Sequence, residues 1–354
     1  MNEILNKNDV KTREEYENFV SNHINGNFMQ SLCWTGVKKD WNYEAVISRD
    51  KNGTIKGTAL VLIRLIPFLG CSFLYSPHGP VCDYRDTETL KDIFAGIELI
   101  RKKYRGYELR VDPCITENDK IEIEVLRNLG FEFNENAPEL TTIQARNNYI
   151  LRINGRSADE IFESFHKKWR YNIRLATKKG VTIKEGTRED LKDFHKIMVE
   201  TGKRDGFITR PLEYFEKMYD NMAPDHMKVL LAYYDGKPIS GVIPIFYGNK
   251  TWYLYGASSN EHRNLMPNYL LQWEMIKLAI SRHDDIYDFR GVSGVVDENH
   301  PQYGLYRFKK GFGAKFTEFI GEIYIPFKPI HFRLYKFSEK TFRTLRQIKR
   351  NLKK

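Results

Sequence analysis

The feature that most constrains the fold of this chain is an internal repeat with a spacing of 180 residues. The aromatic stretch Phe73–Tyr75 is matched by Tyr253–Tyr255, and Tyr107–Arg110 is matched at the same spacing by Tyr287–Arg290. Self-similarity at one long spacing is the sequence sign of a duplicated structural unit. We therefore expect two units of the same fold, one in each half of the 354 residues.

Each half has the same expected order of elements: helix, strand, hairpin, strand, strand, helix, strand. The hairpin turns are predicted at Asn52-Gly53 and Asp235-Gly236, each between two apolar runs. This is the element order of the acyltransferase fold called GNAT, a mixed sheet flanked by helices. We therefore expect an α+β protein with two tandem GNAT-like domains, at residues 1–150 and 151–325, and a basic tail at 326–354.

Most of the net charge of +10 lies in this tail, where ten Lys and Arg residues accompany one acid, Glu339. Apolar residues recur there at steps of three and four, which predicts a basic amphipathic helix. Such a helix can lie on an anionic membrane surface. It can equally pack on its own domain with a solvated basic face, or contact RNA.

The rest of the composition points to the cytoplasm. The N-terminus lacks the basic-then-apolar order of a signal peptide. The most apolar stretch, at residues 58–75, is interrupted by Arg64, Pro67 and Gly70, which predicts buried strands and a turn rather than a spanning helix. We expect a cytoplasmic protein, with the tail as its contact to the inner face of the cell membrane.

A second basic feature is a predicted helix that begins around Ser157 and ends before Gly180. One face is apolar, and the other carries Lys167, Arg170, Arg174 and Lys178. A solvated face is one interpretation of this stripe, and contact with the phosphates of RNA or of a nucleotide sugar is the other.

Several common types of site are missing from the sequence. The stretches 83–87 and 262–269, where a GNAT enzyme would hold the pyrophosphate of coenzyme A on a glycine-rich turn, contain no glycine. The four cysteines and nine histidines show no metal-ligand spacing. We therefore expect neither coenzyme A nor another cofactor, and no metal.

Seven blocks of residues occur in one order between Gln30 and Tyr324. They are Gln30-Ser31 with Trp34 and Val37-Lys38, then 76–81, 109–113, 172–174, 204–207, 210–215 and 304–309. In this order they resemble the Fem family, the aminoacyltransferases that form peptidoglycan bridges. The short run from Tyr214 to Tyr253 leaves no room for the helical arm of longer members, so the chain resembles a compact, armless member.

The resemblance implies a reaction. The enzyme would move glycine, alanine or serine from aminoacyl-tRNA, its co-substrate, to the side-chain amine of the third residue of a peptidoglycan precursor. The precursor would be lipid II or UDP-MurNAc-pentapeptide, and the tail favours the lipid-linked form. A different acceptor, or a non-catalytic RNA-binding role, are the alternatives.

The resemblance also implies roles for residues that bind the precursor. Lys38 and Arg210 would bind its diphosphate, through a point charge and a planar fork respectively. Tyr214, Tyr253 and Tyr255 would assist, although alternate residues on a strand often simply pack.

At the reaction centre, the resemblance assigns Lys309. We expect it to stabilise the oxyanion and to hold the tRNA 3′ end, while Phe308 stacks on the terminal adenine. Arg307, Lys309 and Lys310 could otherwise form a solvated basic edge. Asp112 could take a proton or orient the attacking amine, or it could cap the segment after its strand.

Overall fold

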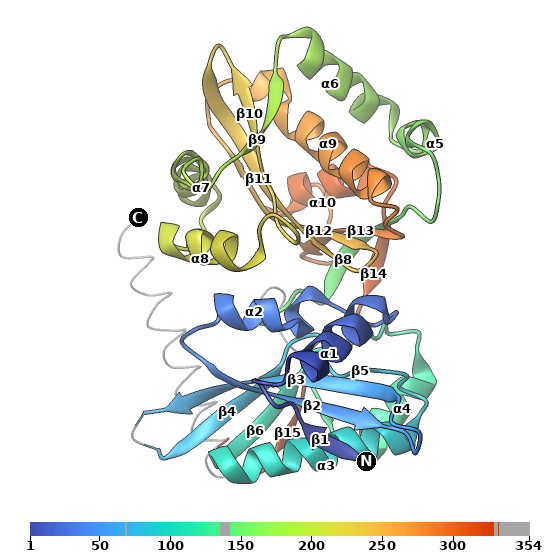
Figure 1. The fold of residues 1–354 in the computed structure, drawn as a ribbon. Coiled ribbons are helices and arrows are strands. Elements are labelled where there is room, and N and C mark those ends of the chain that lie inside the picture. Colours follow the sequence, from blue (N-terminus) through green and yellow to red (C-terminus); the bar gives the residue numbers. More distant parts are fainter. Residues whose placement is uncertain (68, 135–141, 329–331, 333–354) are drawn as a thin grey trace. The chain divides into compact units, whose positions relative to one another are not determined.

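The computed structural model describes all residues of the chain except 68, 135–141, 329–331 and 333–354. The described residues form two mixed β-sheets, each with helices packed against it (Figure 1). This confirms the expected α+β class. Apart from residues 326–328 and Phe332, the predicted tail helix lies outside the described residues.

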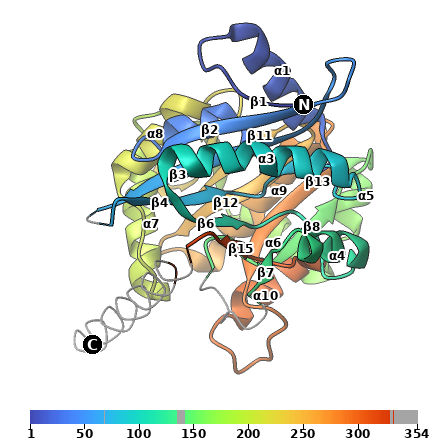
Figure 2. The same cartoon turned by 90° about the horizontal axis from the view of Figure 1, so that it is seen from below.

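The first sheet follows the order β1-β2-β3-β4-β6-β15-β7, and the short β5 pairs with β3. The strands are β1 (Asn2–Ile4), β2 (Asn42–Arg49), β3 (Ile55–Ile66), β4 (Cys71–Ser76), β5 (Val81–Cys82), β6 (Gly106–Val111), β7 (Glu132–Phe133) and β15 (Ile323–Pro326). Helix α3 (Thr87–Tyr104) crosses this sheet (Figure 2) and buries the face that carries Leu90, Ile93, Ile97 and Ile100. Along the chain, helix α1 (Val10–Asn22) lies between β1 and β2, and α4 (Lys120–Asn128) lies between β6 and β7.

The second sheet follows the order β14-β8-β13-β12-β11-β10-β9. The strands are β8 (Asn147–Arg152), β9 (Thr182–Gly186), β10 (Val229–Tyr234), β11 (Lys237–Tyr247), β12 (Lys250–Ser258), β13 (Ile286–Val292) and β14 (Lys315–Glu318). Its helices are η1 (Phe28–Gln30), α2 (Leu32–Val37), α5 (Ala158–Glu163), α6 (Lys167–Lys178), α7 (Leu191–Asp205), α8 (Leu212–Met222), η2 (Arg263–Leu265), α9 (Pro267–Ser281) and α10 (Tyr303–Lys310). Helices α6 and α9 pack side by side, and α9 covers β10 to β13 (Figure 1).

The duplication predicted from the sequence is visible in both sheets. The matched aromatic stretches lie in β4 and β12. Each strand is followed along the chain by a long helix, α3 or α9, and then by a strand that pairs parallel to it, β6 or β13. Both predicted hairpin turns are confirmed, with Gly53 and Gly236 at φ +83° and +72°, a conformation that glycine adopts without steric cost. No helix in the described part of the chain is both long and apolar enough to span a membrane.

The contacts divide the chain into two units that interleave along the sequence. The first unit holds Met1–Tyr16, the stretch that begins at Lys39 and the segment that begins at Glu322, while Glu17–Lys38 belongs to the second. This differs from the boundaries predicted at residues 150 and 325. Strand β8 already pairs with β13 before residue 150, and β15 inserts between β6 and β7 of the first sheet. The two units are therefore set by which strands pair, and not by the order of the residues along the chain.

Candidate functional site

The second sheet opens at the carboxyl ends of its two parallel strands. Strands β12 and β13 pair only from Lys250–Trp252 with Ile286–Asp288, although both strands continue beyond these residues. The counterparts in the first unit, β4 and β6, stay paired as far as Ser76 and Val111. Ligands of open sheets with parallel strands bind outside the carboxyl ends of those strands. The opening in the second sheet is therefore a candidate reaction site.

Lys309, on α10, points its amine into this opening. The side chain is buried, and Nζ donates hydrogen bonds to the carbonyl oxygens of Arg290 at 3.2 Å and Gly291 at 2.7 Å. The amine lies 5.9 Å from the ring centroid of Tyr253. Burial lowers the pKa of Lys309 to about 7. The attraction of Asp288 opposes this shift, and the repulsion of Arg290 adds to it. This amine can therefore hold or release a proton near neutral pH, which an exposed lysine does not do.

Asp288 supports the strand segment that Lys309 contacts. One carboxylate oxygen accepts the backbone N–H of Arg290 at 2.7 Å, and the other accepts the side-chain amide of Asn148 at 3.2 Å. Arg290 has φ +61°, and the pairing of β13 with β8 shifts register at this point. Burial raises the pKa of Asp288, and the neighbouring cations oppose that rise. The bulge turns the carbonyl groups of Arg290 and Gly291 toward Lys309.

Asp288 was not among the residues predicted from the sequence. The signal that could have found it is the repeat itself, because Glu108 and Arg110 in the first half match Asp288 and Arg290. In the first unit Arg110 pairs with Glu108 at 2.9 Å and with Glu322 at 3.4 Å. Its guanidinium lies 5.0 Å from the ring of Phe73, the counterpart of Tyr253. The equivalent place in the first unit is thus filled by its own ion pairs.

Lys38 and Arg210 lie near one aromatic ring, that of Tyr214, and their role in binding a diphosphate stays a prediction. Lys38 follows α2 and Arg210 precedes α8, and their charged groups lie 5.4 Å and 5.0 Å from the ring centroid of Tyr214. Burial lowers the pKa of Lys38 to about 8, and repulsion from Arg210 adds to this. No salt bridge of Lys38 or Arg210 is found within the part of the chain that the structure describes. Two neighbouring cations without a carboxylate partner form a good site for an anion with several oxygens.

Tyr253 and Tyr255 do not act as one group, although they alternate on the same strand. The pairing of β11 with β12 shifts register between Ile243 and Pro244 and leaves Leu254 as a bulge. Tyr253 packs with the core cluster that includes α9, near Lys309. Tyr255 instead contacts Phe215 and Tyr214 at ring distances of 5.1 Å and 6.4 Å. The bulge therefore separates the two tyrosines that were predicted to act together. Tyr253 lies with Lys309, and Tyr255 lies with the group around Lys38 and Arg210.

Phe308 is partly buried against other aromatic rings. Its ring lies 5.1 Å from that of Tyr269 and 5.2 Å from that of Phe312, and its carbonyl accepts the indole N–H of Trp169 at 2.8 Å. These contacts hold α10 in the core and so fix the neighbouring Lys309. The predicted stacking of Phe308 on adenine stays a prediction.

Asp112 lies in the first unit, whereas Lys309 lies in the second. Its two carboxylate oxygens accept the hydroxyl of Tyr75 and the backbone N–H of His78, both at 2.6 Å. His78 has φ +54°, so this carboxylate holds a turn that would otherwise be unfavourable. Neither of these two contacts reaches the segment after β6, and the predicted roles of Asp112 in proton transfer and in capping that segment stay predictions.

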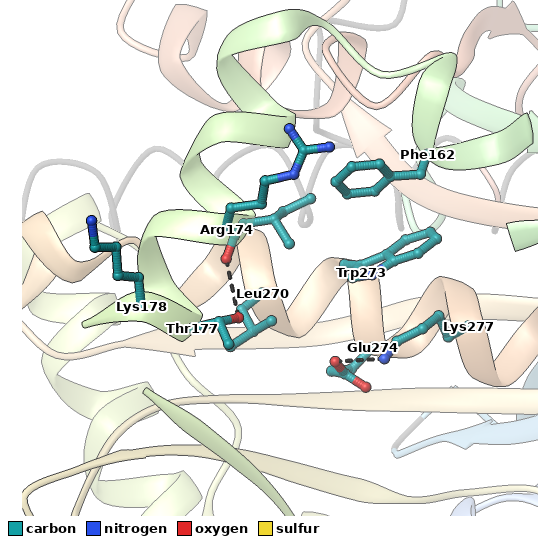
Figure 3. A pocket seen from close by; sticks show the side chains of 9 residues that line it. Phe162, Arg174, Thr177, Lys178, Leu270, Trp273, Glu274 and Lys277 are labelled. Carbon is teal, nitrogen blue, oxygen red and sulfur yellow. Dashed lines mark hydrogen bonds and ion pairs between the residues drawn. The ribbon is translucent and has the colours of Figure 1, made fainter. Parts of the chain in front are cut away.

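A groove of about 540 Å³ lies between α5, α6 and α9 (Figure 3). Phe162 and Trp273 form an aromatic wall with ring centroids 5.1 Å apart. Cations from the predicted stripe, Arg174 and Lys178, lie along its rim. Lys277 also lines the groove and pairs with Glu274 at 2.9 Å. The groove thus combines aromatic surface with an excess of positive charge.

The sequence matches the model of the FemAB family over residues 11–237 and 235–340. The chain belongs to the FemAB family. It is 30% identical to a lipid II:glycine glycyltransferase of Staphylococcus epidermidis, over 97% of this chain and 98% of the relative. The enzyme of the same name from Staphylococcus aureus is 29% identical over the same shares. The first alignment spans 410 residues, so this FemAB relative has segments without a counterpart here.

Solved structures agree with the FemAB assignment. The crystal structure of FemX superposes with a TM-score of 0.86 and 27% identity, over 94% of this chain and 99% of FemX. A tandem GNAT protein from the clavulanic acid pathway, at 9% identity and a TM-score of 0.56, shares the fold over 92% and 98% of the two chains. Only a short connection joins α8, which ends at Met222, to β10, which begins at Val229. The compact, armless form is therefore confirmed.

Proposed function

We propose that this FemAB-family protein is an aminoacyltransferase of peptidoglycan bridge synthesis. It takes an amino acid from aminoacyl-tRNA and adds it to the side-chain amine of the third residue of the precursor peptide. The name shared by the curated relatives supports glycine as the amino acid and a lipid-linked precursor as the acceptor. The observation that carries the proposal is the buried amine of Lys309 at the opening between β12 and β13.

The reaction joins the acceptor nitrogen to the ester carbonyl carbon and breaks the bond to the ribose oxygen of the tRNA. The protonated form of Lys309 stabilises the oxyanion and then passes a proton to the leaving ribose oxygen. The neutral form takes the proton that the attacking amine loses, so the lysine ends as it began. A pKa of about 7 suits an amine that must do both. The carbonyl groups of Arg290 and Gly291 orient Nζ, and Asp288 keeps that segment in place.

Two further groups of residues would hold the substrates. Lys38 and Arg210 would bind the diphosphate of the acceptor, since their paired charges match its oxygens. The groove of Figure 3 would hold the RNA of the donor, because Arg174 and Lys178 can contact phosphates beside an aromatic surface. The reaction as proposed needs no cofactor.

The test is a transfer assay with purified protein. A set of labelled aminoacyl-tRNAs is mixed with lipid-linked or nucleotide-linked muropeptide, and the products are identified by mass. We expect the precursor to gain the mass of one residue, with Lys309→Met reducing the rate and Lys310→Met, the exposed neighbour on α10, serving as the control. Absence of transfer from every charged tRNA to both precursors would refute the proposal and leave another acceptor or an RNA-binding role.

A further inference from the structure

The turn between α7 and α8 exposes two large apolar side chains next to Arg210, which forms a cationic pair with Lys38. Phe207 is 46% exposed and Ile208 is 77% exposed. Single exposed apolar residues are common on protein surfaces, whereas contiguous exposed apolar surface is typical of contact sites. Arg210 follows only two residues after Ile208, so their Cα atoms are within about 8 Å of each other. The turn thus places apolar surface next to an anion site.

The turn is held by hydrogen bonds and close packing at both ends. Gly206 ends α7 at φ +73°, and the N–H of Phe207 donates to the carbonyl of Gly202 at 3.0 Å. A Cβ on Gly202 would lie 2.6 Å from Thr209, so this glycine lets the turn fold back onto the helix. At the other end, His195 Nε2 lies 3.1 Å from the carbonyl oxygen of Arg210. The two apolar side chains are therefore presented on a fixed support.

Hydrogen bonds connect the end of α7, which carries this turn, to β12, one of the two strands at the opening. Arg204, in the last turn of α7, donates to the carbonyl oxygen of Ser258 at 2.8 Å and to its hydroxyl at 3.1 Å. Thr201 also exchanges hydrogen bonds with the backbone of Ser258. Because Ser258 ends β12, the exposed turn keeps a constant place relative to that strand.

We propose that Phe207 and Ile208 contact the apolar chain of a lipid-linked diphosphate whose phosphates are held by Lys38 and Arg210. In such a molecule the first carbons of the chain are bonded directly to a diphosphate oxygen, so apolar surface must lie next to the phosphate site. A nucleotide-linked diphosphate would instead present a ribose and a base there. The inference rests on the proposed function for the nature of the acceptor and names the element that selects its lipid-linked form.

Vesicle binding tests this contact without requiring transfer. Full-length wild-type protein, Phe207→Ser/Ile208→Ser and the control Ile24→Ser, whose side chain is 82% exposed, are floated with phosphatidylcholine vesicles containing a polyprenyl diphosphate. A second set of vesicles carries the same surface charge on phosphatidylglycerol in place of the polyprenyl diphosphate. Binding to this set measures how much the basic tail contributes through charge alone. We expect the double variant to lose roughly tenfold in affinity for the polyprenyl diphosphate vesicles alone, and Ile24→Ser to bind like wild type.

A second measurement separates a local effect from a damaged site. Inorganic pyrophosphate should compete equally well against wild type and the double variant, while Lys38→Met should weaken that competition. Unchanged vesicle binding by the double variant, or equal loss of vesicle and pyrophosphate binding, overturns the inference. Absence of transfer in the earlier assay, with vesicle binding that still depends on Phe207 and Ile208, would refute the proposed reaction but not this contact.

Discussion

Gly256 leaves the space that the side chain of Tyr253 occupies. A Cβ placed on Gly256 would overlap the Tyr253 hydroxyl oxygen and lie 2.5 Å from Cζ of the ring. Burial raises the pKa of Tyr253 to about 12, so the hydroxyl stays neutral in its enclosed position. The absence of a side chain at Gly256 thus sets where the ring beside Lys309 can lie.

Gly256→Ala should therefore displace the ring of Tyr253 and slow transfer. We expect the free energy of unfolding to fall by about 1–3 kcal/mol, as for other overpacked sites. Single-turnover transfer and urea unfolding measure the two effects. Gly304→Ala is the matched control, because a Cβ at Gly304 on α10 meets no atom within 4 Å. Equal rates for the two variants would show that the position of Tyr253 is unimportant.

Lys309→Arg should abolish most of the activity even though it keeps a positive charge. A guanidinium has a pKa above 12 and does not release its proton, so it cannot relay one. Loss of general acid–base catalysis typically slows a reaction roughly 10²–10⁴-fold. Single-turnover rates of Lys309→Arg and Lys309→Met should therefore be similarly low. An active Lys309→Arg variant would mean that charge alone is needed.

The stability of the protein should rise with pH as Lys309 loses its proton. The folded pKa of about 7 lies below the ordinary lysine value of 10.5, so the unfolded chain binds more protons between these two values. Below pH 7 Lys309 is protonated in both the folded and the unfolded protein, so the folded protein bears the full free-energy cost of the buried charge. This cost disappears as the pH approaches 10.5. Urea unfolding at several pH values should show that Lys309→Met reduces this rise, while Lys310→Met does not. Identical pH dependence in both variants would contradict the burial of the amine.

Changes to the cationic pair should act on acceptor binding. Lys38→Met removes a positive charge, and Arg210→Lys replaces a planar fork with a point charge. Each variant should raise the KM for the diphosphate-linked precursor about tenfold and leave kcat nearly unchanged. Steady-state kinetics at saturating aminoacyl-tRNA measure both constants. A fall in kcat at constant KM would place the pair in the chemical step instead.

Charge reversal in the groove should weaken binding of the donor RNA. Arg174→Glu and Lys178→Glu remove potential phosphate contacts, and each contact to a single strand contributes about 0.7 to the slope of log affinity against log salt. Filter binding of aminoacyl-tRNA at several salt concentrations measures this slope. Lys192→Glu, an exposed lysine on α7, is the control. Equal slopes for the groove variants and the control would exclude the groove as an RNA site.

Local patterns predicted much of the architecture. The repeat predicted two similar sheets, and the Asn-Gly and Asp-Gly turns predicted their hairpins, because such turns depend on neighbouring residues alone. Lys38, Arg210 and Tyr214, named from the family resemblance, lie close together, but their role stays a prediction.

Other features depend on contacts that no local pattern encodes. The bulge at Leu254 reverses the side on which the later residues of β12 point, and alternation alone had placed Tyr253 with Tyr255. Asp288 acts through a backbone shape that arises only when β13 pairs with β8. The pairing of β15 with β6 joins residues more than 200 positions apart, and its register cannot be inferred from either segment alone.

The interleaving of the two units has a consequence for synthesis on the ribosome. Strand β15, which lies between β6 and β7, is translated after every strand of the second sheet. The amino-terminal unit is thus the first to begin and the last to be completed. Until Ile323–Pro326 emerges, the edge of β6 lacks its neighbour, and a nascent chain is exposed to wrong strand pairing there. A premature stop shortly before Ile323 would therefore damage the half of the protein that was made earliest.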